Sequence, residues 1–247
     1  MSLNRGEETK YDIYFRWGIL MPRAGEARFS FNESEWQGQP ASLYRMIFHT
    51  ANIFEAIYKM RDTINCYYGL DNTLLYGLKH TVESGYDLTD ILTFSYIGEK
   101  TSVHSFRYTP TATKLDTTLT VASGHVFDML GATFLLRTID RHTVETGDVF
   151  ACTVVTGKDL INTCFRYQGQ AIVERDNYKY RTHYYIIDIL DDAFSQTKAS
   201  AELWIGDDDN YVPVKVRTKL KIGYAEVYLK SVANLKKPFD CRVQIKK

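Results

Sequence analysis

The stretch YDIYFRWGILMPRAGEARFSF, residues 11–31, predicts a β-hairpin and with it the class of the fold. From Tyr11 to Trp17 apolar side chains recur at every second residue, the period of a strand with one buried face. Residues 21–25 then bring proline and glycine together, which favours a turn, and the alternation resumes beyond them. The chain therefore begins with two antiparallel strands.

Further β-rich runs follow the hairpin. In the first half of the chain they lie near residues 43–49, 64–68, 73–82, 91–96, 102–108 and 117–121. In the second half they lie near residues 148–156, 160–168, 178–190, 200–205, 211–220, 223–232 and 241–246. Residues 52–61 fit either a strand or a helix. Strands that follow one another without crossover helices form antiparallel sheets, and a sheet of roughly a dozen strands curls or closes.

Residues 123–142 give the clearest helical pattern. Ser123 suits an N-cap, and Phe127, Leu130 and Phe134 begin a wide apolar stripe with helical spacing. We therefore expect a mainly β protein: one domain over residues 1–247, with antiparallel strands in a strongly curved, incomplete barrel and this principal helix packed in or across it. Residues 1–8 are expected to be a vector-derived start or disordered.

Trp204 is expected to be a second structural anchor. Leu203 and Ile205 flank it on the opposite face of the predicted strand, so both faces of the strand should be covered. These expectations concern packing and imply no chemistry.

Charge and hydropathy exclude some functions. Lys plus Arg and Asp plus Glu are 30 each, so the formal charge is zero, which argues against a protein that binds nucleic acid or an acidic membrane through an excess of positive charge. No run approaches the roughly 20 apolar residues of a transmembrane helix. The N-terminus lacks the apolar region of a signal peptide, so the protein is either cytosolic or exported with its signal peptide removed.

The four cysteines form no CxxC motif and none lies near a histidine, so zinc and redox motifs have no support. Cys152 and Cys164 each stand six residues from Lys158, the centre of a predicted three-residue hairpin loop over residues 157–159. We expect their side chains to face each other, and a disulfide between them stays open.

Motifs of catalysis are mostly missing: the sequence predicts no catalytic, cofactor-binding or metal-binding residue and no cofactor. Gly206–Asn210, the densest acidic cluster, fits a solvated β-turn better than a calcium loop. A second acidic group, Asp188, Asp191 and Asp192, could supply a general acid and base together with Asp207–Asp209. A glycan or lipid hydrolase that uses these carboxylates is therefore the alternative function.

Asp62-Thr63-Ile64 and Asp116-Thr117-Thr118 match a short acceptor pattern for O-glycosylation in some bacterial envelopes. Two matches barely exceed what chance produces in this composition, so glycosylation at these sites stays open.

Three stretches together resemble a known family. They are SGHVFDML (residues 123–130) with LLR (135–137) and Gly147-Asp148, ELWIGDDDNYVPV (202–214), and IGYAEVYL (222–229) with LKKPF (235–239). In this order they resemble the bacterial exported proteins grouped as domain of unknown function 3108. The resemblance implies a periplasmic or other cell-envelope protein with a mainly β, YmcC-like architecture. It implies no catalytic residue.

The leading hypothesis is a non-enzymatic envelope protein whose curved sheet binds an amphipathic or glycan-like ligand, such as an envelope lipid or polysaccharide. It rests on the neutral charge, the 18 tyrosines and a barrel too wide for strand side chains alone to fill. Arg137 and Arg141 would then lie at the rim, where carboxylates or an anionic head group could meet them. Alternatively the tyrosines cover both sheet faces, the helix plugs the cavity, and the arginines are ordinary cations of a helix C-terminus. The oligomeric state cannot be predicted.

Overall fold

A computed structural model describes residues 3–51, 55, 59–190, 199–221 and 223–245. The first strands are β1 (Glu7–Arg16), β2 (Arg23–Trp36), β3 (Gln39–Thr50), β4 (Met60–Tyr68), β5 (Leu74–Glu83), β6 (Tyr86–Ile97), β7 (Lys100–Thr109) and β8 (Ala112–Val121). A short strand β9 (Val126–Phe127) and the helix α2 (Gly131–Leu136) follow. The remaining strands are β10 (Val149–Thr156), β11 (Asp159–Arg175), β12 (Tyr178–Leu190), β13 (Ala199–Gly206), β14 (Pro213–Lys219), β15 (Tyr224–Ala233) and β16 (Arg242–Gln244).

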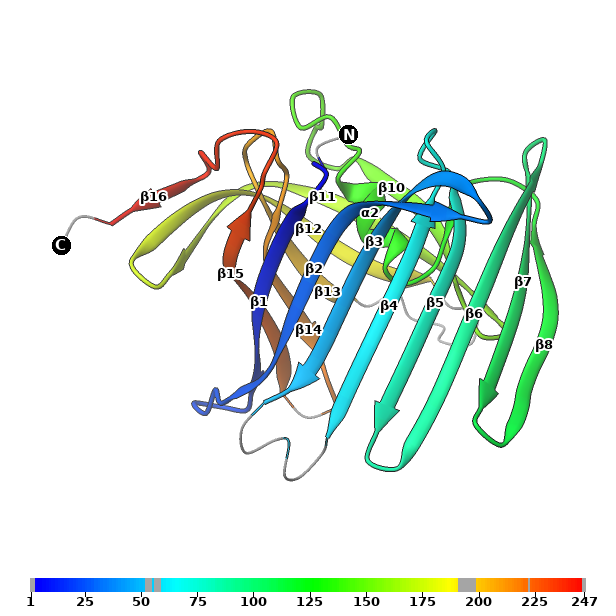
Figure 1. The fold of residues 1–247 in the computed structure, drawn as a ribbon. Helices are drawn as coiled ribbons and strands as arrows, with labels where there is room; N and C mark the ends of the chain where they lie inside the picture. The colour runs from blue at the N-terminus through cyan, green and yellow to red at the C-terminus, as the bar shows by residue number, and fades with distance from the viewer. Residues whose placement is uncertain (1–2, 52–54, 56–58, 191–198, 222, 246–247) are drawn as a thin grey trace.

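These strands form one curved sheet. Its order is β8-β7-β6-β5-β4-β3-β2-β1-β15-β14-β13-β12-β11-β10-β9, with β16 paired to β12. Neighbouring strands are antiparallel except for the short β9–β10 pair. Within the described residues β8 and β9 stand at the two ends of the path and do not pair, so the barrel has one seam (Figure 1). The predicted class, a mainly β, antiparallel and incomplete barrel, is confirmed.

The helix is much shorter than predicted. Of residues 123–142 only Gly131–Leu136 are helical. Gly124 has a φ of +97°, outside the helical region, and Val126 and Phe127 pair as a strand with β10. The apolar spacing is present, but Val126 and Phe127 pair with β10 where the first helical turns were expected. Beyond Leu136, the N–H groups of residues 137–139 bond to carbonyls three residues back instead of four, so the α-helix does not continue.

The α2 segment lies between the two walls of the barrel, as Figure 1 shows. Leu130 and Phe134 pack into the core formed with strands β2–β7, and the Phe134 ring stacks on Tyr68 with the ring centroids 4.2 Å apart. Leu136 packs into the opposite core, with Tyr185 and other side chains of β10–β13. The helix therefore lies in the concavity, and its two faces join cores that the sheet alone would leave apart.

The hollow that remains against Asp128 has a volume of about 30 Å³, no more than a water molecule or two. The Asp128 carboxylate lies between the Cys66 thiol, at 3.1 Å, and the backbone N–H of Gly131, at 2.6 Å. Burial raises the pKa of Asp128. A ligand inside the barrel at α2 would have to displace side chains that pack into the two cores.

The predicted partnership of Cys152 and Cys164 is wrong. Thr156 pairs with Asp159, so the loop has two residues and not three. Cys152 therefore lies opposite Thr163, and Cys164 lies opposite Ala151. A shift of one residue moves a side chain to the other face of the sheet, so the two thiols point to opposite faces. Both are free and buried, as are Cys66 and Cys241.

Trp204 also differs from expectation. Leu203 and Ile205 point into the core, whereas Trp204 faces the other side of the sheet and is only partly buried. Its ring stacks on Tyr184 at 4.9 Å, and the Lys215 amino group lies 4.5 Å from the ring centroid. Trp204 therefore anchors an aromatic and cationic layer on the outer face of the barrel.

The N-terminal residues belong to the fold. Leu3 is buried in a core cluster and Glu7 begins β1, so residues 3–8 are ordered, against the second of the two expectations for them. The Glu7 carboxylate, 3% exposed, forms a two-pronged ion pair with Arg137, the residue that follows α2. One Arg137 nitrogen also donates to the carbonyl oxygen of Asn210 at 2.7 Å. The ion pair thus ties the interior segment to β1 and to the loop after β13.

We expect Glu7→Gln to lower the free energy of unfolding by about 3–5 kcal/mol, because Arg137 would be left as a buried charge without its counter-charge. The double variant Glu7→Leu/Arg137→Met should recover part of that loss, since neither charge remains. Urea unfolding measures both. In the exposed pair Arg5–Glu33, Glu33→Gln is the control and should cost no more than about 1 kcal/mol. Equal costs for Glu7→Gln and Glu33→Gln would contradict this assignment.

Candidate functional site

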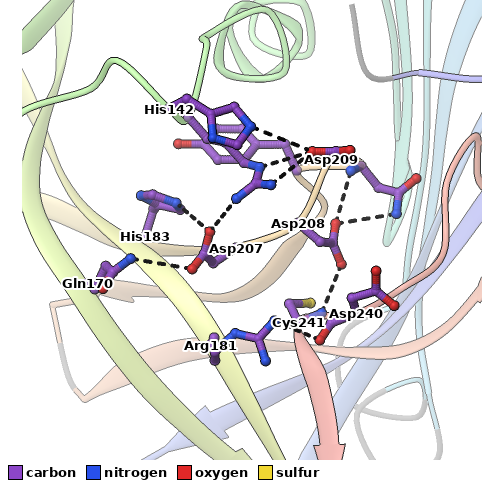
Figure 2. Close-up of polar contacts among 12 residues, drawn as sticks. His142, Gln170, Arg181, His183, Asp207, Asp208, Asp209, Asp240 and Cys241 are labelled. Atoms are coloured by element: carbon purple, nitrogen blue, oxygen red, sulfur yellow. Dashed lines mark hydrogen bonds and ion pairs between the residues drawn. The ribbon is translucent and has the colours of Figure 1, made fainter.

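The loop between β13 and β14, Asp207–Val212, is the centre of the candidate site. Asp208 is buried: one carboxylate oxygen accepts the backbone N–H of Asn210 at 2.9 Å, and the other accepts that of Cys241 at 3.2 Å. The Asn210 side chain donates to the Pro238 carbonyl at 2.8 Å and accepts the N–H of Lys237 at 2.9 Å. The predicted solvated turn is therefore partly buried, and it fastens the C-terminal segment to the barrel (Figure 2).

Asp207 gathers three donors from different elements. Its carboxylate lies 2.8 Å from an Arg141 nitrogen, 3.1 Å from His183 Nε2 and 3.4 Å from the Gln170 amide. Figure 2 shows the contacts of Asp207 with His183 and Gln170. On the other side of the ring, His183 Nδ1 lies 2.9 Å from the Tyr167 hydroxyl. Burial lowers the pKa of His183, although the hydrogen bond to Asp207 acts in the opposite direction.

Arg141 joins this network to the surface. It donates to Asp209 at 2.9 Å, and the His142 ring nitrogen lies 3.9 Å from the same carboxylate. The hydrogen bond from Arg141 lowers the pKa of Asp209. Asp209 is exposed, so the polar chain runs from the buried Tyr167–His183 pair to the solvent.

A hollow of about 330 Å³ opens beside these residues at one end of the barrel. The side chains that line it come from the segment after α2, from the β13–β14 loop and from the C-terminal segment, and they include Arg141, His142, Asp209, Lys236 and Lys237. Both lysines are exposed, and neither has an ion pair with a carboxylate in the described part of the chain. The hollow is therefore polar. Its two lysines form no ion pair within the described chain, although Lys237 lies near enough to Asp209 for its charge to lower the pKa of that carboxyl group.

The two residues predicted for the rim differ in depth. Both Arg137 and Arg141 border the hollow, but the Arg137 side chain is buried and its carboxylate partner is Glu7 of β1. Sequence spacing placed both at one helix end, but the helix ends at Leu136, so they occupy different depths. Of the predicted structural residues in the interior segment, Leu130 and Phe134 are buried, and Phe127 is partly buried between two core clusters.

The two acidic groups of the hydrolase alternative do not meet among the described residues. Within the group Asp207–Asp209, Asp207 and Asp209 do converge, but both bind Arg141. Asp188 is buried next to Arg166, whose guanidinium lies 2.6 Å away. The N–H of Asp207 bonds the carbonyl of Arg181, which precedes Asp188 by seven residues on β12, or about 23 Å along an extended strand. That distance is too long for a carboxylate pair acting on one glycosidic bond. Asp191 and Asp192 lie outside the described residues.

The two glycosylation motifs fall on strands. Asp62 is buried on β4, between β3 and β5, whereas Asp116 is exposed on β8, at the edge of the sheet. The adjacent residues Thr63 and Thr117 are both partly exposed. Only the motif at Asp116-Thr117 therefore lies on an unpaired strand edge of the described sheet.

Sequence analysis missed His183, Tyr167 and the two lysines. His183 and Tyr185 are two residues apart on β12, so their side chains point to the same face of the sheet, and Tyr185 is fully buried. Alternation along residues 180–187 could therefore have placed the imidazole on the inner face. No pattern linked Lys236 and Lys237 to Arg141, because the loop contacts that bring them together have no period. Within the described residues, no group of three or more His, Cys, Asp or Glu side chains could hold a metal ion.

The lowered pKa of His183 predicts a pH dependence of stability. A histidine whose pKa is lower in the folded state contributes stability above its ordinary pKa of 6.5, and this contribution is lost as the pH falls through the folded value. His183→Gln should therefore reduce the loss of melting temperature between about pH 7.5 and about pH 5.5. His104→Gln, on the exposed part of β7, is the control and should follow the wild type. An unchanged pH profile in His183→Gln would contradict the prediction.

Across the described residues, no helix is long and apolar enough to cross a membrane. A comparison with the curated proteins finds no match. Among solved structures, a β-barrel-like protein of the domain of unknown function 1849 from Brucella abortus superimposes with a TM-score of 0.64 at 11% identity, covering 96% of this chain and 100% of that one. This likeness shows the barrel-like fold.

Two further solved structures match less closely. One, from Parabacteroides distasonis, is provisionally described as a lipoprotein (TM-score 0.37, 10% identity, 94% of this chain and 97% of that one). The other, from Bacteroides fragilis, is provisionally described as an exported protein with a YmcC-like fold (TM-score 0.37, 8% identity, 95% and 98%). At these TM-scores they carry no argument about this chain. The family described as "Protein of unknown function (DUF3108)" matches residues 10–230, so the chain belongs to that family.

Proposed function

We propose that the protein is an exported, non-enzymatic component of the cell envelope that binds the anionic group of a glycan or lipid in the hollow lined by Arg141, Lys236 and Lys237. The observation that carries the proposal is the pair of exposed lysines beside a hollow of about 330 Å³, neither of which forms an ion pair with a described carboxylate. Export remains an inference from the family resemblance.

Because side chains of the α2 segment pack inside the barrel, we place the ligand site in the hollow and not inside the curved sheet. A ligand inside the curved sheet would have to displace the α2 segment, whose Phe134 and Leu136 join the two cores. At the hollow, by contrast, a ligand meets side chains that are already exposed. Binding there leaves the barrel intact, and the polar lining suits a phosphate, a carboxylate or an acidic sugar better than an acyl chain.

Arg141 would act as the fixed part of the site. Asp207 and Asp209 hold its guanidinium from two sides, which limits its motion and partly neutralises its charge. The net attraction for an anion therefore comes from Lys236 and Lys237. Asp207 and Asp209 converge on the Arg141 guanidinium, and Asp188 lies far away along β12, so no observation favours the enzymatic alternative.

Calorimetric titration at low salt tests the proposal with three probes: inorganic phosphate, glucuronate as an acidic sugar, and glycerol phosphate as a lipid head group. We expect one of them to bind and Lys236→Ala/Lys237→Ala to weaken that binding roughly tenfold, because two charge-assisted contacts are lost. Lys114→Ala/Lys158→Ala removes the same charge from exposed positions outside the hollow and is the matched control.

Which probe binds would distinguish a glycan from a lipid head group. The proposal would be refuted if none of the three bound, or if the lysine variant of the hollow and the control variant bound the probe equally well.

A further inference from the structure

The tip of the β1–β2 hairpin exposes three large apolar side chains within four residues. Trp17 is 60% exposed, Ile19 100% and Leu20 58%. Single exposed apolar residues are common on soluble proteins, but a contiguous group marks a surface that meets another apolar phase. Elsewhere among the described residues, large exposed apolar side chains stand singly or in pairs, as at Leu70 and at Tyr96-Ile97.

The backbone holds these side chains in the solvent. Trp17 and Leu20 exchange two hydrogen bonds, of 2.9 and 3.0 Å, around a two-residue turn. Gly18 takes a φ of +57° in that turn, which a glycine adopts without strain, and Ile19 occupies its apex. The exposure is therefore a property of a closed turn and not of an irregular end.

Cationic residues lie next to this turn. Gly223 packs so closely on the backbone of Arg16 that any side chain there would collide with the Arg16 carbonyl oxygen, so the β14–β15 turn adjoins the β1–β2 tip. Leu220 of that turn is 40% exposed, and Lys219 and Lys221 on either side of it are exposed. Neither lysine has an ion pair with a described carboxylate.

The other cations near the tip are already neutralised. Arg16 pairs with the buried Glu226, and Arg23 pairs with Asp12 and Glu26. The positive charge available to a partner at this place therefore comes from Lys219 and Lys221. We call Trp17, Ile19 and Leu20, together with Lys219–Lys221, the docking tip.

The docking tip lies at the opposite end of the barrel from the hollow. Glu7, bound to Arg137 close to the hollow, begins β1, and Arg16 ends it at the tip, about 30 Å away along an extended strand. β14 covers the same path, from the loop after Asp207 to Lys219. In Figure 1 the β1–β2 tip protrudes at the lower left, while the loops near the hollow lie at the top.

We propose that the docking tip attaches the protein to the surface of an anionic lipid bilayer. Trp17 suits the head-group region, Ile19 and Leu20 reach the boundary of the acyl chains, and the two lysines are attracted by anionic lipids. The charge complementarity distinguishes a bilayer from a purely apolar partner, which would gain nothing from unneutralised lysines. This attachment does not depend on ligand binding in the hollow, and it would leave the hollow facing away from the membrane.

Co-sedimentation with vesicles tests the proposal. Wild-type protein should bind vesicles of phosphatidylglycerol and phosphatidylethanolamine more tightly than vesicles of phosphatidylcholine, and salt should weaken the binding. Trp17→Ser/Ile19→Ser/Leu20→Ser should bind at least about tenfold more weakly, because the apolar contact is lost. Leu70→Ser/Ile97→Ser, which removes exposed apolar side chains from other loops, is the matched control and should bind like the wild type.

Two further measurements make the test specific. In a Trp36→Phe/Trp204→Phe background, the emission of Trp17 should shift to shorter wavelength when anionic vesicles are added, as the indole leaves water. Lys219→Gln/Lys221→Gln should remove the preference for anionic lipid.

The proposal would be overturned by wild-type protein that binds neither vesicle, by equal binding of the triple-serine and control variants, or by lysine variants that keep the lipid preference. It would also be overturned if sedimentation velocity showed that the tip mediates self-association, because the occupant would then be a second copy of the chain. Circular dichroism confirms that each variant folds, and the co-sedimentation comparison decides even if the variant that keeps Trp17 as its single tryptophan does not fold.

Discussion

Arg137 carries its guanidinium into the barrel directly after α2, and Glu7 at the start of β1 supplies the counter-charge. A buried guanidinium is stable only where a counter-charge and hydrogen-bond acceptors meet its N–H groups. The ion pair therefore fixes the positions of the segments that carry its partners. It holds the end of α2 against β1, and the bond to the Asn210 carbonyl holds the loop after β13. Leu130, Phe134 and Leu136 can then fill the barrel from a fixed position.

Because the α2 segment packs inside the barrel, the two proposed binding surfaces lie at the two ends of the barrel. The hollow with Lys236 and Lys237 opens at one end, where the polar network of Asp207 and His183 reaches the surface. The apolar turn at Trp17–Leu20 lies at the other. The barrel between them acts as a rigid spacer, because β1 and β14 run from one end to the other and their inner faces are covered. Binding at either end does not require the interior of the barrel to open.

The sequence predicted the parts that depend on local periodicity. Alternation from Tyr11 to Trp17 identified the first strand, and the order of loose motifs identified the family. The wrong predictions concern features that leave no periodic pattern in the sequence, namely a loop length and a contact between distant residues. One residue fewer in the loop at Gly157-Lys158 moved Cys152 and Cys164 to opposite faces. Glu7, 130 residues away in sequence, binds the guanidinium of Arg137 in the interior, and no sequence pattern near Arg137 predicts that partner.

Native-state hydrogen exchange of the amides from Ala132 to Thr138 tests most directly whether this segment is a fixed part of the core. The account predicts that in the wild type these amides exchange as slowly as the amides of β4 and β12. In Glu7→Gln they should exchange faster, while the strand amides stay protected relative to global unfolding. Fast exchange of the segment in the wild type would contradict the account, because the interior would then be covered by a movable lid and could open to a ligand. Equal protection of the segment in Glu7→Gln would show that the ion pair does not hold it.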